Sequence, residues 1–137
     1  MEHTTNFRSA FIEVADDSPV SAATEPPLNP QKKSSARTVY ELLREQPYVY
    51  TSDDLLFSLY AQKQAASEED KHALRITFFS KGQPCMRTSD LPKKYGWGIH
   101  FDEAAKMALI PLGSAEYEEL RNDPNLKHEK AMCSART

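Results

Sequence analysis

Residues 97–112 read WGIHFDEAAKMALIPL, and this stretch decides the fold. In residues 97–102 large apolar side chains alternate with small or polar ones, which is typical of a half-buried β-strand. Residues 107–112 form a second apolar run whose only proline stands near its end, where a missing backbone donor is tolerated. Because only a short turn separates the two runs, the sequence predicts an antiparallel β-hairpin.

Apolar periodicity outside the hairpin predicts two further strands and four helices. The strands are expected at 7–14 and 126–132, and the helices at 38–46, 55–60, 67–79 and 114–122. In the helix at 67–79, Ser67 is the expected N-cap, and Ala73, Ile76 and Phe79 form the expected buried stripe. Residues 84–88 are expected to be a short strand or a loop.

The sum of these elements indicates an α+β fold, with a mostly antiparallel sheet and helices packed on one of its faces. The length of 137 residues fits a single domain spanning 1–137. Residues 15–37 hold four of the nine prolines, so neither a helix nor a central strand can persist there. We expect an extended proline- and serine-rich loop that crosses the domain, part of which packs as an arm or moves freely.

Composition restricts the class of protein. With 39% hydrophobic and 27% charged residues, the chain has the balance of a globular protein. Its formal net charge of −3 leaves no overall basic footprint, so we expect no nucleic-acid partner.

No apolar run approaches the roughly 18 residues needed to span a bilayer, and residues 1–11 do not resemble a secretory signal. We therefore expect a soluble cytoplasmic protein with no membrane partner, whose oligomeric state stays open. Its two cysteines, Cys85 and Cys133, are expected to be free thiols.

Basic and aromatic residues gather in 78–102, against the acidic balance of the whole chain. Arginine can bind an anion through two parallel hydrogen bonds, and tryptophan offers a stacking face for a planar group. The sequence therefore predicts a groove for a small anionic or planar ligand, lined by Lys81, Arg87, Tyr95, Trp97 and His100. The plainer interpretation is a solvated charged rim on a hairpin with an aromatic core.

A catalytic alternative uses Cys85 as nucleophile or His100 as base, with Asp102 orienting the imidazole. A buried inert thiol and a surface histidine explain the same residues more simply. The spacing of the histidines fits no helical metal motif, so we expect neither a metal nor a cofactor, although a site assembled by the fold, such as His3, His100 and Asp53, stays open. Asp53 and the neighbouring Asp54 are expected to serve a helix cap or a turn.

Several longer strings are also characteristic. They are HTTN at 3–6, FIEVA at 11–15, PYVYTSDD at 47–54, FFSKGQPC at 78–85 followed by Arg87, KYGWGIHFD at 94–102, and KAM at 130–132. On these strings the chain resembles a bacterial family known only as domain of unknown function 6157. The resemblance implies no activity, ligand or catalytic residue, but it adds weight to a binding site near the strings in 78–102.

Three functional hypotheses follow in order. The first is a non-catalytic binding module, and the second is a protein-interaction domain that uses the proline-rich segment, where Pro27 and Pro30 have PxxP spacing. The third is an enzyme that uses Cys85 or His100.

Overall fold

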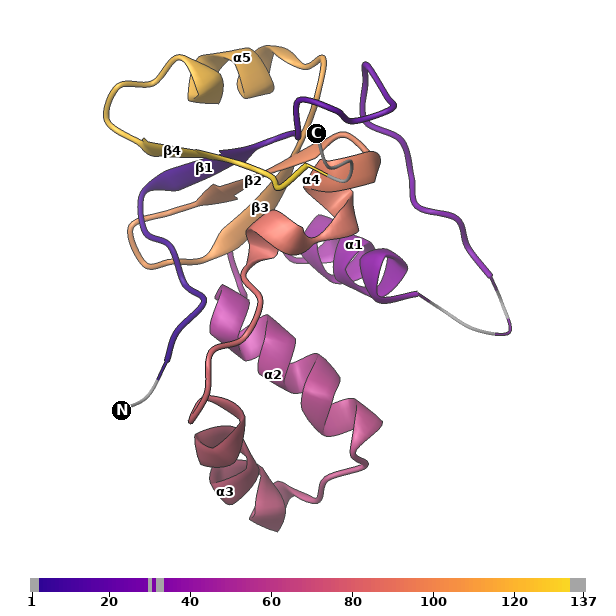
Figure 1. Ribbon diagram of the computed structural model, residues 1–137, viewed down its shortest axis with the longest axis vertical. Helices are drawn as coiled ribbons and strands as arrows, with labels where there is room; N and C mark the ends of the chain where they lie inside the picture. Colours follow the sequence, from indigo (N-terminus) through magenta and orange to yellow (C-terminus); the bar gives the residue numbers. More distant parts are fainter. Residues whose placement is uncertain (1–2, 30, 32–33, 134–137) are drawn as a thin grey trace.

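The computed structural model describes residues 3–29, 31 and 34–133. Their centre is one four-stranded sheet with the order β3-β2-β1-β4 (Figure 1). The strands are β1 (Ala10–Glu13), β2 (Trp97–Phe101), β3 (Met107–Pro111) and β4 (Lys127–Lys130). The predicted hairpin is confirmed, since β2 and β3 pair antiparallel with Ile99 opposite Leu109. Strand β1 pairs antiparallel with β2 and parallel with β4, so the sheet is mixed.

The helices begin at residues whose side chains cap them. Ser34, Thr51, Ser67 and Ser114 each accept a hydrogen bond from the backbone N–H three residues on, which satisfies a donor that the first turn leaves free. The helices are α1 (Ser35–Glu45), α2 (Ser52–Lys63), α3 (Glu68–Phe78), the 3₁₀ turn η1 (Met86–Thr88), α4 (Asp90–Lys94) and α5 (Ala115–Arg121).

Helices cover both faces of the sheet, which corrects the expectation of helices on one face. Helix α5 lies against one face, where the ring of Tyr117 meets that of Phe11 at 5.1 Å and its hydroxyl accepts from the Val14 N–H. Helices α1 and α4 contact the opposite face through β3 and β2 (Figure 1). Strand β2 is consequently buried on both sides rather than half-buried. Gly98 has to be small because a Cβ there would lie 2.7 Å from the Phe11 ring.

The proline-rich loop ends at Ser34, because α1 starts at Ser35, earlier than predicted. Part of it packs as an arm: the Thr24 N–H donates to the Tyr95 carbonyl at 2.8 Å, and the Trp97 indole donates to the Thr24 carbonyl at 2.8 Å. Gly96, with φ of +77°, permits this approach, since a Cβ would lie 2.9 Å from the Ala22 carbonyl oxygen.

The buried stripe predicted for the helix at 67–79 is only partly present in α3. Phe79 is buried just beyond its C-terminus, but Ala73 is exposed and Ile76 is 57% exposed. The reason is tertiary, because α3 packs against α2 in a helical hairpin that projects away from the sheet, and no second layer covers its outer face (Figure 1).

Residues 84–88 contain η1 instead of a strand, and α4 was not predicted, since five residues are too few to show a helical period. Strand β1 is shorter than the predicted 7–14, and β4 confirms the weakly patterned final strand. No helix in the part of the chain that the structure describes is long and apolar enough to cross a bilayer.

Candidate functional site

A cavity of about 380 Å³ opens between α1, α2 and the segment 83–90 that leads from α3 to α4. Most of its lining is apolar. The residues around it are Ser35, Ala36, Val39, Leu56, Leu59, Tyr60, Lys63, Phe78, Gln83, Pro84, Cys85, Met86, Thr88, Ser89 and Asp90. It lies on the same side of the sheet as the main core, because Val39 and Met86 belong to that core.

Helix α2 supplies the longest wall of the cavity. Leu56, Leu59, Tyr60 and Lys63 recur at i, i+3, i+4 and i+7, so their side chains share one face. The other faces of α2 are also occupied, since Leu55 is buried in the main core and α3 packs beside the helix. The apolar residues at 55, 56, 59 and 60 predict a helix from the sequence, but because α2 is apolar on several faces, the pattern does not show which face lines a cavity.

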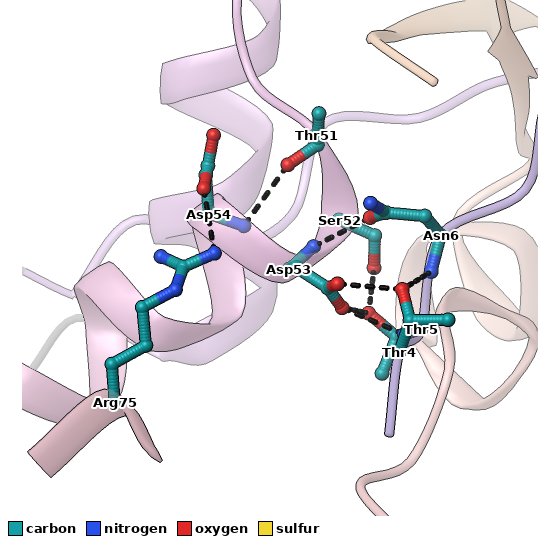
Figure 2. Close-up of polar contacts among 8 residues, drawn as sticks. All are labelled: Thr4, Thr5, Asn6, Thr51, Ser52, Asp53, Asp54 and Arg75. Carbon is teal, nitrogen blue, oxygen red and sulfur yellow. Dashed lines mark hydrogen bonds and ion pairs between the residues drawn. The ribbon is translucent and has the colours of Figure 1, made fainter. Parts of the chain in front are cut away.

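The start of α2 is fastened to the N-terminal segment by a network of short hydrogen bonds (Figure 2). The Asp53 carboxylate accepts from the Thr5 N–H at 2.6 Å, the Thr5 hydroxyl at 2.7 Å and the Thr4 hydroxyl at 2.6 Å. The Asn6 side chain accepts from the Asp53 N–H, and Thr5 also bonds to the fully buried Ser52 hydroxyl. We call this set of residues 4–6, 52 and 53 the N-terminal latch.

Arg75 joins α3 to α2. Its guanidinium donates to the Asp54 carboxylate at 2.9 Å (Figure 2). It also lies over the rings of Phe57 and Phe79, at 5.4 Å and 5.3 Å from their centroids. The latch and this pair both hold the start of α2, where the end of α3 lies beside it.

The segment opposite α2 is ordered by its own hydrogen bonds. The Gln83 amide donates to the Phe78 carbonyl at 2.7 Å, and the Thr88 hydroxyl donates to the Cys85 carbonyl at 2.8 Å. The Cys85 thiol is half-buried in this wall and is free, as predicted, while Cys133 is exposed and also free. These bonds hold part of the cavity wall in place, as a pre-formed binding site requires.

The sequence profile of a family of unknown function (DUF6157) matches residues 2–137. The chain belongs to this family. No curated protein and no solved structure shows significant similarity to it. Membership supplies no activity, so the geometry alone must carry the functional argument.

Two of the strings that carried the family resemblance, 3–6 and 47–54, meet in the N-terminal latch. The two aspartates, which were expected to serve a helix cap or a turn, have separate roles in the structure. Thr51 supplies the cap, Asp53 holds the N-terminal segment, and Asp54 pairs with Arg75.

The five residues predicted to line a groove do not face the cavity. Lys81 is exposed in the turn after α3. Arg87 donates through Nε to the Lys130 carbonyl at 2.7 Å, and its own carbonyl accepts from the Met132 N–H, so it borders β4. The role of the five in ligand binding stays a prediction, but the structure distributes them over different surfaces.

Trp97 and Tyr95 lie beside the proline-rich arm. Trp97 is 6% exposed and packs between Tyr40 and Arg44, whose guanidinium lies 4.9 Å from the indole centroid. Its face is thus covered by the protein itself.

His100 lies on the other face of the sheet from Trp97, because successive side chains of a strand alternate. Its Nδ1 is hydrogen-bonded to the Tyr48 hydroxyl at 2.8 Å. Burial lowers the pKa of His100, against the opposing effect of the Asp102 and Glu116 carboxylates. Burial likewise raises the pKa of Tyr48.

Cys85 and His100 do not form a nucleophile–base pair in the described residues, since the imidazole bonds to Tyr48 and Cys85 lines the cavity on the opposite side of the sheet. Within 3–29, 31 and 34–133, no three His, Cys, Asp or Glu side chains gather as a metal site would need. His3, His100 and Asp53 are accordingly not assembled into one.

Proposed function

We propose that this protein is a non-catalytic binding module for a small planar or anionic molecule, which it holds in the cavity between α1, α2 and residues 83–90. The observation that carries the proposal is the cavity itself. Its volume of about 380 Å³ falls within the roughly 300–1,000 Å³ typical of small-molecule sites. Like such sites, it combines a mostly apolar lining with a few polar groups at fixed positions.

An aromatic surface in the wall supports a planar ligand. The rings of Tyr60 and Phe78 stack at 4.6 Å with an interplanar angle of 30°, and both residues line the cavity. A flat apolar group can extend this stack without disturbing a polar partner.

The site differs from the groove that the sequence suggested, while the class of ligand is retained. The Arg87 Nε and the Trp97 indole N–H donate within the protein, and Lys63 and Tyr60 are the cation and the aromatic surface at the cavity.

The alternatives have less support. The enzyme hypothesis lacks a nucleophile–base pair in the described residues, because Cys85 and His100 lie on opposite sides of the sheet. Of the two prolines with PxxP spacing, Pro27 is exposed and Pro30 lies outside the described residues, so the structure adds nothing to the interaction hypothesis. We place the protein in the cytoplasm, for which the free thiols of Cys85 and Cys133 are the support, because disulfides form in oxidising compartments.

The test is a fluorescence titration with 8-anilinonaphthalene-1-sulfonate, which is planar, anionic and brighter in apolar surroundings. Leu59→Trp fills the cavity and should remove the fluorescence gain of the native protein. The control, Ser58→Trp, places the same side chain on the exposed face one residue away and should leave the gain intact. Both variants must keep a cooperative thermal transition. Equal dye binding by Leu59→Trp, with the fold intact, would contradict the proposal.

A further inference from the structure

Two charged side chains border the cavity, and they are not equivalent. The Asp90 carboxylate has a cation nearby, with Lys94 Nζ at 3.8 Å. The Lys63 ammonium is exposed and has no hydrogen bond or ion pair with any residue that the structure describes. A positive charge without a partner therefore lies at the rim of an apolar cavity.

The position of Lys63 makes the two ends of the α2 wall of the cavity chemically different. Leu56 and Lys63 lie seven residues apart on one face of α2, which corresponds to roughly 10 Å along the helix at about 1.5 Å per residue. Leu59 and Tyr60 lie between them, so this wall is apolar along its length and cationic at the C-terminal end of α2. The first turn of α1, at Ser35 and Ala36, also borders the cavity. The N-terminus of a helix carries a partial positive charge, so this turn adds to the positive potential at the cavity.

Resting on the proposed function, we propose that the cavity selects amphipathic carboxylic acids. The apolar body of the ligand, about 10 Å long, lies along Leu56 and Leu59, and its carboxylate pairs with Lys63. An apolar body removes the cavity lining from water, which supplies affinity in proportion to the area covered. The lysine supplies the preference for an anion, because a cationic head would meet the same ammonium with repulsion.

The experiment is a titration followed by ¹³C-methyl NMR of the leucines in the full chain. The probes share an apolar body and differ in the head group: octanoate, 1-octanol and octyltrimethylammonium. Naphthalene-2-carboxylate is the fourth probe, and it distinguishes a planar aromatic acid from a linear one. Methyl shifts at Leu56 and Leu59 report where each probe binds, and their concentration dependence gives the Kd.

Octanoate or naphthalene-2-carboxylate should bind more tightly than 1-octanol, and octyltrimethylammonium least. Lys63→Gln should weaken carboxylate binding by about three- to tenfold, the range for a partly exposed charge-assisted hydrogen bond, and leave 1-octanol unchanged. Lys106→Gln makes the same chemical change at an exposed lysine away from the cavity and should alter none of the affinities. Lys63→Glu should reverse the preference toward the cationic probe.

Carboxylate affinity that Lys63→Gln does not change would overturn this inference. So would tighter binding of octyltrimethylammonium than of octanoate by the native protein, or no carboxylate binding at all. In each of these cases a dye signal that depends on Leu59 would leave the proposed function standing. If the dye signal did not depend on Leu59, both the proposed function and the preference for carboxylates would be overturned.

Discussion

Asp53 and Asp54 are adjacent in the sequence, but their surroundings indicate that the two carboxylates contribute differently to the stability of the fold. Asp53 is half-buried and accepts three hydrogen bonds from the N-terminal segment, at 2.6–2.7 Å. Asp54 is exposed and makes one ion pair with Arg75, whose own side chain is 37% exposed. Removing the Asp53 carboxylate leaves the hydrogen-bond donors of the N-terminal segment without their acceptor. If the pair of Asp54 and Arg75 is broken, water can instead hydrate the charged group that remains.

We expect Asp53→Ala to lower the free energy of unfolding by about 2 kcal/mol, because the buried Thr5 hydroxyl and N–H lose an ionised acceptor. Asp54→Ala should cost at most about 1 kcal/mol, as exposed ion pairs do. Urea unfolding followed by circular dichroism measures both. If the two variants prove equally stable, the N-terminal latch does not contribute to stability as its geometry indicates.

At the scale of elements, the edge of the sheet at β4 is protected by η1. An unpaired strand edge exposes backbone donors and acceptors to other chains, and proteins commonly cover such edges. Here Arg87 covers the end of the edge twice, through the Nε bond to the Lys130 carbonyl and the bond from the Met132 N–H to its own carbonyl. This arginine, which the sequence suggested as an anion ligand, makes structural contacts here, and its role in ligand binding stays a prediction.

We expect Arg87→Ala to destabilise the protein by about 1 kcal/mol, the usual contribution of one hydrogen bond, since the side-chain bond to Lys130 is lost. Arg121→Ala is the matched control, because Arg121 makes only an exposed i, i+3 pair with Glu118 in the described structure, and its removal should change stability by less than about 0.5 kcal/mol. Thermal denaturation compares them. An unchanged melting temperature for Arg87→Ala, combined with weaker anion binding, would restore the ligand role of Arg87.

At the scale of the whole molecule, the protein has two parts of unequal packing. Helices cover the sheet on both faces, and its strands carry half of the large side chains that are fully buried in the described residues. The α2–α3 hairpin projects from this body, and α3 itself contains no buried residue (Figure 1). The cavity lies where the two parts meet, so we expect a ligand bound there to affect the position of the hairpin.

Native-state hydrogen exchange should therefore show α3 opening at a lower free energy than β2, because fewer buried contacts break when α3 opens. Asp53→Ala should raise exchange in α2 and α3 more than in the sheet, since the N-terminal latch holds the hairpin. A ligand in the cavity should slow exchange in α2. Identical protection in α3 and β2 would instead mean that the molecule opens only as a whole.

Elements with strong local patterns were predictable. The hairpin of β2 and β3 and the caps at Ser67 and Ser114 follow from residues close together in sequence, where alternation and short polar side chains act directly. The existence of α4 was not predictable, because it is shorter than two turns. The start of α1 was missed although its Ser34 cap is local, because Ser34 and Ser35 stand at the end of a serine-rich segment predicted to be a loop.

The candidate site was predictable only in its ingredients. A cation and aromatic rings were expected in one groove, and the cavity does contain Lys63 and Tyr60, together with Cys85, which was expected as an inert thiol or a nucleophile. Of these only Cys85 stood in the segment that the sequence singled out. The others belong to α2, which the sequence predicted as a helix at 55–60, but its several apolar faces did not show which one would line a cavity.

The sequence by itself determined an α+β fold, the hairpin, most helices and their caps, because these depend on interactions between near neighbours in the chain. The alternation of side chains along residues 97–102 already places Trp97 and His100 on opposite sides of their strand. Tertiary structure alone decided that helices cover both faces of the sheet and that α2 forms a cavity wall. The bonds behind the last result join residues 47 to 49 positions apart, between Thr4–Asn6 and Ser52–Asp53. No local pattern encodes such pairings, since they form only when the whole chain packs.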